Sequence, residues 1–296
     1  MDKEDSDTKC AYNKEEESNM NPMFYYHALS VFIQSISEFL PISSSAHLTI
    51  LSWINGESLT LTDKITLHLG SLFALMIYYR QFIFESFLGI GSCLFSLFNN
   101  PFDLFLDLLA EWERKSMFGK ILIITLPGAM AGFFLNDYAT TLHIPLVIGS
   151  TSIIGGGLLI FADYYKRSSH IETSTKDLLS NSQAFLIGLF QIAALIPGMS
   201  RMGTIITASR YLGLTRLEAT HLAFITAMPM IAGAVLLNWS KFPKINTIFV
   251  PTLVITIISY LMIHLMVYLA TKIRYIWFGF YRIILGLGIL YFLFMI

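Results

Sequence analysis

The chain alternates between long apolar stretches and short polar ones, and the apolar stretches approach the length that crosses a bilayer. A transmembrane helix needs about 20 consecutive, mostly apolar residues. Five stretches are clear, and two are less clean because the first is short and the second contains Glu85. The clear stretches are residues 120–135, 144–161, 221–237, 248–270 and 277–296, and the less clean ones are residues 65–79 and 82–97. This pattern predicts an all-α, polytopic integral membrane protein.

Polar segments separate these stretches and divide the chain. Residues 102–117 mix charged residues with Leu and Trp, which is typical of an amphipathic helix in the membrane interface. Residues 99–101 and 136–138 are predicted loops, and residues 166–181 form the longest polar connection. We therefore expect a polar, disordered tail at residues 1–22 and a single membrane domain at residues 23–296, with halves at 23–165 and 182–296.

Basic residues flank one pair of apolar stretches. Arg114, Lys115 and Lys120 precede the pair, and Lys or Arg at positions 166, 167 and 176 follow it. Cytoplasmic loops of membrane proteins carry an excess of Lys and Arg. Both polar segments are therefore predicted on one face of the membrane, the cytoplasmic face.

Composition narrows the classes of function. The 296 residues are 55% hydrophobic and 13% charged, with a mean hydropathy of +0.63. The formal net charge is -1, so the chain offers no strongly basic surface for DNA or RNA. We therefore expect no nucleic-acid partner, and we expect membrane lipids as partners. Cys10 and Cys93 have neither a metal-binding spacing nor the pattern of a disulfide framework.

Two polar clusters interrupt the apolar pattern at corresponding places in the two halves. Residues 37–47 read SEFLPISSSAH and residues 197–204 read PGMSRMGT. Each follows an apolar helix that contains a Gln, Gln34 or Gln191, and each contains a Pro that ends the helix. Broken helices at membrane depth are tolerated only where the freed backbone faces protein or a watery cavity. In matching positions of two halves they predict inverted-topology repeats, re-entrant helices and a site at the repeat interface.

The first cluster groups residues that could bind a phosphate and act on it. Gln34 and Glu38 lie four residues apart, so on a helix their side chains share one face. The serines at 43–45 offer hydroxyl and backbone N–H groups where the next helix would begin, close to His47. Free N–H groups at a helix N-terminus bind anions, and Ser is a favoured cap there.

The second cluster repeats this arrangement with a stronger cation. Gly198 allows close backbone approach, Ser200 can cap or donate, and Arg201 presents a planar fork that fits phosphate oxygens. Two anion-binding helix starts, together with a carboxylate and an imidazole, predict a phosphate site and leave room for a divalent metal.

These motifs resemble the signature of the undecaprenyl-diphosphate phosphatases, also called bacitracin-resistance proteins, from about Tyr26 to the C-terminus. The family pattern of an (E/Q)xxxE pair, a FLPxSSxxH run and a PGxSRSGxT run corresponds to residues 34–38, 39–47 and 197–205. Supporting matches are Leu69-Gly70-Ser71, Gly188-x-x-Gln191, Ala227-x-Pro229 and Tyr281-Arg282. The resemblance implies a membrane phosphatase that hydrolyses undecaprenyl diphosphate to undecaprenyl phosphate and inorganic phosphate. Such an enzyme recycles the lipid carrier for peptidoglycan and envelope glycan synthesis.

The resemblance also implies roles for individual residues. The implied catalytic residues are Glu38, Ser44 as nucleophile, His47 as acid or base, and Arg201. The implied phosphate-binding residues are Ser43, Ser45, Gly198, Ser200 and Thr204. A divalent cation, Mg²⁺ or Ca²⁺, would be held by Gln34 and Glu38. The implied substrate is a polyprenyl diphosphate lipid, at a site that faces the periplasm in the bacterial cytoplasmic (inner) membrane.

The chain departs from the family pattern at two positions. Met202 replaces the second Ser of SRSG, and Ile205 stands where a Thr is expected, with Thr204 one residue earlier. A shift of one residue turns a side chain by about 100° around a helix, which weakens Thr204 as a substitute for the missing hydroxyl. Each lost charge-assisted hydrogen bond is worth roughly 1.5 to 3 kcal/mol, which is compatible with reduced rather than abolished activity.

Other interpretations remain open. His68 and His221 each precede a Leu at the start of an apolar stretch, where helix packing or an interfacial position is favoured over chemistry. The broken-helix site could also serve a transporter or flippase of a lipid phosphate or another anion. Glu38 and His47 favour the phosphatase, because anion binding alone does not require them. The sequence also leaves a homodimer open.

Overall fold

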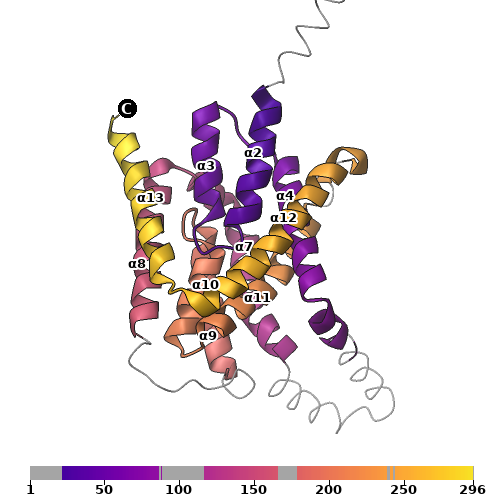
Figure 1. Ribbon diagram of the computed structural model, residues 1–296, viewed down its shortest axis with the longest axis vertical. Coiled ribbons are helices and arrows are strands. Elements are labelled where there is room, and N and C mark those ends of the chain that lie inside the picture. The colour runs from indigo at the N-terminus through magenta and orange to yellow at the C-terminus, as the bar shows by residue number, and fades with distance from the viewer. Residues whose placement is uncertain are drawn as a thin grey trace, which may run out of the picture.

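The computed structural model describes residues 22–86, 88, 117–165, 179–238, 241, 242 and 244–295, and this part of the chain consists of helices joined by turns and short connections. The main elements, labelled in Figure 1, are α2 (Pro22–Ser37), α3 (Ser44–Asn55), α4 (Leu61–Tyr78), α7 (Met117–Thr141), α8 (Pro145–Tyr165), α9 (Asn181–Ile192), η2 (Ala193–Leu195), α10 (Arg201–Tyr211), α11 (Arg216–Leu237), α12 (Ile245–Lys272) and α13 (Ile276–Met295). The predicted all-α class is confirmed.

Five of the described helices, α7, α8, α11, α12 and α13, are long and apolar enough to cross a membrane. They contain the five clear apolar stretches except for Ile144 and for Ile296, which lies outside the described residues. The prediction of a multi-pass membrane protein is confirmed. α4 contains most of the predicted stretch 65–79. The predicted stretch 82–97 is described only as far as residue 88, and the predicted amphipathic helix 102–117 only at residue 117. The predicted N-terminal tail lies outside the described residues except for Pro22.

α7 is longer than the sequence pattern predicts. It continues through residues 136–138, which were expected to form a loop, and ends at Thr141. Polar residues do not end a helix by themselves, because the backbone hydrogen bonds can continue past the membrane surface. Asn and Asp only lower the helix propensity by a fraction of a kcal/mol.

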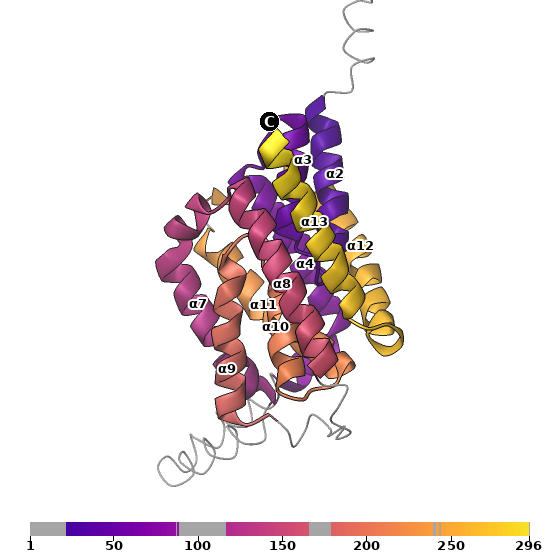
Figure 2. The same ribbon diagram turned by 90° about the vertical axis from the view of Figure 1, so that its left-hand side faces the viewer.

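Two short helical hairpins enter the molecule from opposite ends (Figures 1 and 2). The first consists of α2 and α3, and the second of α9, η2 and α10. α3 and α9 have 12 residues each and α10 has 11, which is too short to cross a bilayer. The re-entrant broken helices predicted from the two polar clusters are therefore present.

The helices around the hairpins pack in matching pairs. α12 packs against α2 of the first hairpin as α7 packs against α9 of the second. α4 and α11, which follow the hairpins in the chain, contact each other, and α8 and α13 run alongside each other. Because the hairpins enter from opposite ends, this pairing is the arrangement of inverted repeats.

Glycines bring α8 and α13 into close contact. A Cβ atom at Gly156 would lie 2.7 Å from the carbonyl oxygen of Gly279, and a Cβ atom at Gly149 would lie 2.8 Å from the side chain of Leu290. Small residues at helix interfaces let backbones approach in membranes, where packing rather than water exclusion holds helices together. Gly149 and Gly156 therefore belong to the interface between α8 and α13.

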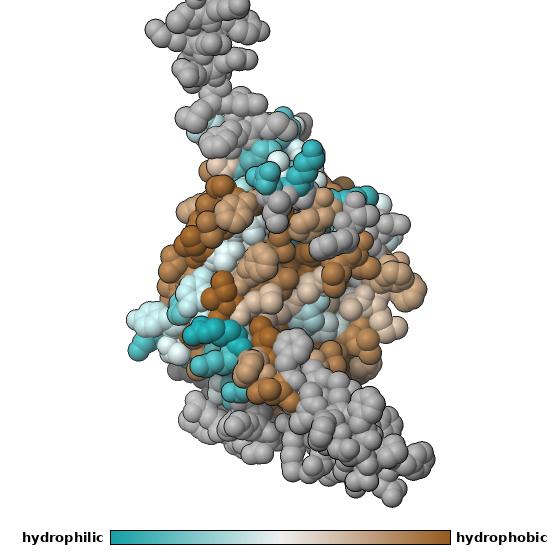
Figure 3. Space-filling model, turned by 90° about the vertical axis from the view of Figure 1, so that its right-hand side faces the viewer, coloured by the Kyte–Doolittle hydropathy of each residue, from teal (hydrophilic) through white to brown (hydrophobic). Residues whose placement is uncertain are grey.

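The outer surface carries the apolar residues that face lipid. Large exposed side chains include Phe249, Ile257 and Leu261 on α12 and Phe292 on α13. Figure 3 shows apolar residues across the middle of one face, with hydrophilic residues gathered toward its ends. This distribution fits a molecule embedded in a bilayer.

The start of α7 and the start of α9 lie on the same face of the molecule. The Lys120 ammonium donates to the side-chain oxygen of Asn181 at 3.1 Å and also to the carbonyl oxygen of Leu179. The prediction that the basic segments around residues 114–120 and 166–181 share one face is consistent with this contact.

Candidate active site

The turns of the two hairpins meet inside the molecule, although their residues are far apart in the chain. The guanidinium of Arg201 forms a hydrogen-bonded ion pair with the Glu38 carboxylate across a separation of 163 residues. The backbone N–H of Gly198 donates to the Ser45 hydroxyl at 3.3 Å. The structure thus unites the two polar clusters, as the repeat pattern predicts.

A serine with a left-handed backbone begins the second helix of each hairpin. Ser43 caps α3 with φ of 72°, and its hydroxyl oxygen accepts from the Ala46 N–H at 3.4 Å. Ser200 caps α10 with φ of 64° and accepts from the Gly203 N–H at 3.1 Å. Among the described residues these are the two non-glycine positions with positive φ. This matching geometry places Ser44 and Arg201 at equivalent first positions of their helices.

Glu38 is the centre of a hydrogen-bond network. Its Oε2 atom accepts from the Ser44 hydroxyl at 2.6 Å and from the Gln34 amide at 3.2 Å, while Oε1 faces Arg201. The Glu38 side chain is 8% exposed and that of Arg201 is 20% exposed. A carboxylate that accepts from a serine hydroxyl can take its proton when that serine attacks an electrophile.

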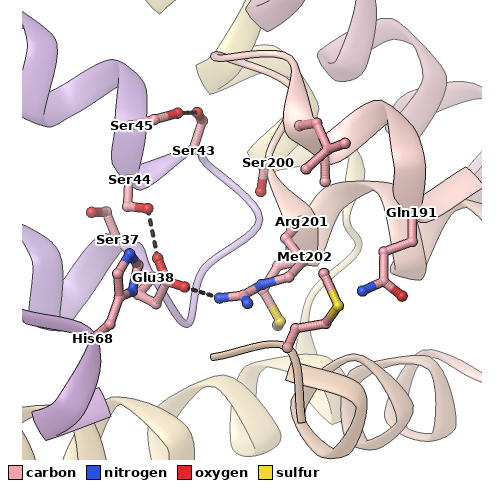
Figure 4. A pocket seen from close by; sticks show the side chains of 13 residues that line it. Ser37, Glu38, Ser43, Ser44, Ser45, His68, Gln191, Ser200, Arg201 and Met202 are labelled. Carbon is pink, nitrogen blue, oxygen red and sulfur yellow. Dashed lines mark hydrogen bonds and ion pairs between the residues drawn. The ribbon is translucent and has the colours of Figure 1, made fainter. Parts of the chain in front are cut away.

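A pocket of about 220 Å³ opens where the two turns meet (Figure 4). It is lined by both hairpins, by α4 and by α11. The lining residues are Ser37, Glu38, Ser43, Ser44, Ser45, His68, Gln191, Ala194, Leu195, Ser200, Arg201, Met202 and Met230. Hydroxyl groups, one carboxylate and one guanidinium thus face a single small space, which suits a phosphoryl group.

Six of the predicted site residues line this pocket. They are Glu38, Ser43, Ser44, Ser45, Ser200 and Arg201. Gln34 lies behind them and contacts the pocket through Glu38. Met202, where the family pattern has a Ser, also lines the pocket, so the substitution puts a thioether in place of a hydroxyl at the wall.

Gly198 and Thr204 have structural positions outside the pocket lining. Gly198 has φ of +93°, and a Cβ atom there would lie 2.6 Å from the carbonyl oxygen of Ile148, so only glycine fits this turn. The Thr204 hydroxyl donates to the carbonyl oxygen of Arg201 at 2.9 Å, and the residue is 4% exposed. As its shifted register suggested, Thr204 does not take the place of the missing hydroxyl.

His47 also lies outside the pocket lining, and both of its ring nitrogens have partners. Nδ1 lies 2.7 Å from the carbonyl oxygen of Ser43, and Nε2 lies 2.6 Å from the Tyr281 hydroxyl. The two rings are stacked, with an interplanar angle of 3°. His47 therefore links α3 to α13 in this structure, and its catalytic role stays a prediction.

Sequence reasoning missed two pocket residues that carry amide or imidazole groups, His68 on α4 and Gln191 on α9, together with Ser37, Ala194, Leu195 and Met230. His68 was assigned to helix packing, and Gln191 was noted only as part of the second motif. The available signal was a polar side chain inside an apolar stretch, which is a functional indication by default in membrane proteins. Nothing local distinguished them, because α4 must first pack beside the hairpin before His68 reaches Glu38.

Arg282 holds the second turn in place from α13. Its side chain is fully buried, and Nη2 donates to the carbonyl oxygens of Gly198 and Met199 at 2.9 and 2.8 Å. The Thr151 hydroxyl of α8 donates to the carbonyl oxygen of Pro197 at 2.5 Å. The backbone before Ser200 and Arg201 is therefore fixed by side chains from the α8 and α13 pair.

The residues predicted to hold a divalent cation are paired with other protein groups in this structure. Gln34 turns its amide N–H toward Glu38, and the Arg201 cation occupies the other carboxylate oxygen. Mg²⁺ and Ca²⁺ require several oxygen ligands and are repelled by a neighbouring guanidinium. Within the described part of the chain, no group of three or more His, Cys, Asp or Glu is placed to hold a metal ion.

Comparison with known proteins supports the resemblance read from the motifs. Residues 28–288 match the family described as "Bacitracin resistance protein BacA". A protein named undecaprenyl-diphosphatase from Alcanivorax borkumensis is 34% identical over 281 residues, which cover 92% of this chain and 100% of that protein. Proteins of the same name from Hahella chejuensis and Pelotomaculum thermopropionicum are 34% and 32% identical over 271 and 265 residues, covering 88% and 87% of this chain and 95% and 92% of theirs.

Proposed function

Because the chain belongs to the bacitracin resistance protein BacA family, we propose that it hydrolyses undecaprenyl diphosphate to undecaprenyl phosphate and inorganic phosphate. The reaction would return the lipid carrier to peptidoglycan and envelope glycan synthesis. The observation that carries the proposal is the contact between the hairpin turns, where Arg201, Glu38 and Ser44 form one network. The names of the relatives support the same substrate.

In this proposal the pocket acts on the terminal phosphoryl group. Arg201 and the Ser200 hydroxyl bind its oxygens, and the Ser44 oxygen attacks the phosphorus while its proton passes to Glu38. The bond to the bridging oxygen breaks, and its electron pair leaves on the prenyl monophosphate. A water molecule then cleaves the phosphoserine, the proton returns from Glu38 to Ser44, and inorganic phosphate leaves.

The prenyl chain requires an apolar path beside this polar pocket. An apolar groove lies between α3 and α13, and it is lined by Ile50, Trp53, Ile54, Pro145, Ile284, Leu285, Gly288, Ile289, Phe292 and Leu293. α3 contributes to both spaces, with Ser44 and Ser45 at the pocket and Ile50 about 9 Å further along the helix. We place the distal part of the prenyl chain, beyond its first isoprene units, in this groove.

Phosphate release from undecaprenyl diphosphate by the purified protein in detergent tests the function. Glu38→Gln, Ser44→Ala and Arg201→Ala are each expected to lower kcat/KM by about 10² or more, since each removes a group that acts in the transition state. Size-exclusion profiles of the variants check that they stay folded. Full activity in the Glu38 and Arg201 variants would contradict the assignment.

The same assay separates hydrolysis from transport. Detergent micelles support no gradient, so a pure transporter or flippase would release no phosphate. No observation in the described structure favours transport over hydrolysis, because a carboxylate bound to a serine hydroxyl is needed for chemistry and not for anion binding. A protein that binds the substrate but releases no phosphate would indicate a transporter instead.

The divalent cation and the homodimer stay predictions. Loss of phosphate release on chelation, with recovery on adding Mg²⁺ or Ca²⁺, would confirm the cation, and activity that is unchanged by a chelator would contradict it. The proposed reaction involves no metal ion. The mass of the protein–detergent complex distinguishes a monomer from a dimer.

We also propose that the protein lies in the cytoplasmic (inner) membrane of a bacterium with its site open to the periplasm. The support is the basic segment at the start of α7, which shares a face with the start of α9 and is expected in the cytoplasm. The first hairpin enters from the opposite end (Figure 1). With Cys10 and Cys93 replaced by Ser, labelling of a Glu57→Cys variant by a membrane-impermeant reagent in intact cells would confirm this orientation. Protection of that cysteine would contradict it.

A further inference from the structure

The pocket contains buried polar atoms that have no hydrogen-bond partner. Nδ1 of His68 is buried and lacks a hydrogen-bond partner, and so do both amide atoms of Gln191. Gln191 is 1% exposed. Buried polar groups in proteins are nearly always paired, and each exception calls for a reason.

These two side chains differ from the other unpaired groups by their location. Within the described residues, buried nitrogen or oxygen atoms without a hydrogen-bond partner also occur on Ser152, Asp163, Ser209, Arg210, Thr252, Ser259, Arg274 and Arg282. None of that second set lines the pocket, whereas His68 and Gln191 both do. The coincidence of missing partners with the pocket points to a ligand that accepts hydrogen bonds from the His68 ring and from the Gln191 amide nitrogen.

His68 and Gln191 lie on opposite sides of the charged pair. Figure 4 shows His68 beside Glu38 and Ser44, and Gln191 beyond Arg201 on the far side of the pocket. The pocket is therefore polar at both ends, with the guanidinium between them. A ligand that meets both ends must have acceptor atoms at two places, as the two phosphoryl groups of a diphosphate do.

The chemistry of the two side chains suits phosphate oxygens. A neutral imidazole has one N–H donor and an amide has two, while a diphosphate offers only acceptor oxygens apart from any protonated one. Because Arg201 is already paired with Glu38, its charge neutralises the anion only in part. Hydrogen-bond donors on either side of it would complete the binding of the anion. His47 cannot supply a donor from its present position, since both of its nitrogens are engaged.

We propose that His68 and Gln191 are substrate-binding residues at the two ends of the pocket. His68, beside Ser44, donates to the terminal phosphoryl group, and Gln191 donates to the phosphoryl group that carries the prenyl chain. The assignment rests on the proposed function for the identity of the substrate. The pocket would thereby recognise a diphosphate as such, with one donor from each half of the chain.

The two roles can be separated with the two products as probes. Inorganic phosphate corresponds to the terminal group, and farnesyl phosphate to the group that carries the prenyl chain. Their dissociation constants for the detergent-purified protein are measured by calorimetry, which does not depend on turnover. His68→Ala is expected to raise the dissociation constant of inorganic phosphate by about tenfold and to change that of farnesyl phosphate by no more than about twofold. Gln191→Leu is expected to weaken farnesyl phosphate binding and to leave inorganic phosphate binding nearly unchanged. His68→Gln keeps an N–H donor, so it should retain most of the phosphate affinity that His68→Ala loses.

A second variant moves Gln191 without removing its amide. A Cβ atom at Gly128 on α7 would lie 3.2 Å from Cδ of Gln191, whereas one at Gly132, a turn away, would lie 3.7 Å from Leu195 in ordinary contact. Gly128→Ala should therefore weaken the binding of farnesyl phosphate by severalfold, and Gly132→Ala should leave it unchanged. Ser259→Ala is the control for an unpaired buried group outside the pocket, and it should leave both constants unchanged.

The outcomes distinguish failure of this inference from failure of the proposed function. If the unmodified protein releases phosphate but the His68 and Gln191 variants bind both probes as it does, the inference is wrong and the function stands. If both variants weaken both probes equally, the assignment of separate ends is wrong. If the protein releases no phosphate yet shows the crossed pattern of binding, the inference stands and the hydrolytic function fails.

Discussion

At the scale of single residues, the site depends on two serines held in a strained conformation. Ser43 and Ser200 have φ of 72° and 64°, a region where a side chain costs of order 1 to 3 kcal/mol. Each hydroxyl caps the helix that follows and also faces the pocket. A glycine would relax the backbone but would remove the hydroxyl, so the sequence retains a costly residue where its oxygen has two uses.

Replacing Ser200 separates the conformational effect from the chemical one. Ser200→Ala removes the cap and keeps the strain, which should lower the unfolding free energy by about 1 kcal/mol. Ser200→Gly also removes the cap but relieves the strain, so its thermal midpoint in detergent should lie near that of the unmodified protein. Both should lower phosphate release to a similar extent, since both lack the hydroxyl. Equal thermal midpoints for the two variants would show that the backbone of Ser200 is not strained.

The charged residues and the serines of the site could be predicted from the sequence, whereas His68 and Gln191 could not. Glu38 and Arg201 stand out because a charge in an apolar stretch is costly and needs a partner. His47 was selected for its place in a motif, yet its ring binds Tyr281. His68 reaches the pocket only because α4 packs beside the first hairpin, and no local pattern encodes that long-range contact.

At the scale of elements, the second turn depends on a buried guanidinium between α8 and α10. A Cβ atom at Gly155 of α8 would lie 2.7 Å from Cζ of Arg282, and one at Gly203 of α10 would lie 2.6 Å from Nη1. The two glycines make room for the side chain that binds the carbonyl oxygens of Gly198 and Met199. Helix packing thus determines where Arg201 begins its helix.

A side chain at Gly155 would occupy the space that Arg282 needs, and this should lower activity although Gly155 lies outside the pocket. Gly155→Ala displaces Arg282 and with it the turn, and displacements near 1 Å can cost up to a hundredfold in rate. We expect kcat to fall by about tenfold or more. Gly157→Ala is the matched control on the same helix, because its Cβ atom would meet nothing within 4 Å. Equal activity of the two variants, measured as phosphate release, would show that Arg282 does not position the turn.

Element boundaries were less predictable than the presence of the elements. α11 begins at Arg216, five residues before the predicted stretch, because Thr215 and Glu218 form a capping box that starts the helix in polar sequence. α7 likewise continues past the apolar stretch to Thr141. Hydropathy locates the part of a helix that lies in lipid, whereas caps and backbone hydrogen bonds determine where the helix begins and ends.

At the scale of the whole molecule, the inverted arrangement explains why a polar pocket exists within an apolar protein. Each hairpin alone would leave its turn and its charge facing lipid. Glu38 and Arg201 become tolerable only when the two turns meet, since a buried ion without its partner costs several kcal/mol. The weak internal repeat in the sequence was sufficient to predict that meeting, but the groove between α3 and α13 depends on which helices are neighbours and was not foreseen.

If the prenyl chain lies in the groove between α3 and α13, then filling the groove should affect long substrates selectively. Gly288 is exposed in the groove, and a Cβ atom there would meet nothing within 4 Å, so Gly288→Trp can occupy the space without disturbing the fold. We expect KM for undecaprenyl diphosphate to rise by about tenfold, a loss of about 1.4 kcal/mol in binding, while KM for farnesyl diphosphate changes less because its chain is shorter. Gly233→Trp is the control, since Gly233 on α11 is also open but lies outside the groove. Unchanged KM for the long substrate would place the prenyl chain on another face of the protein.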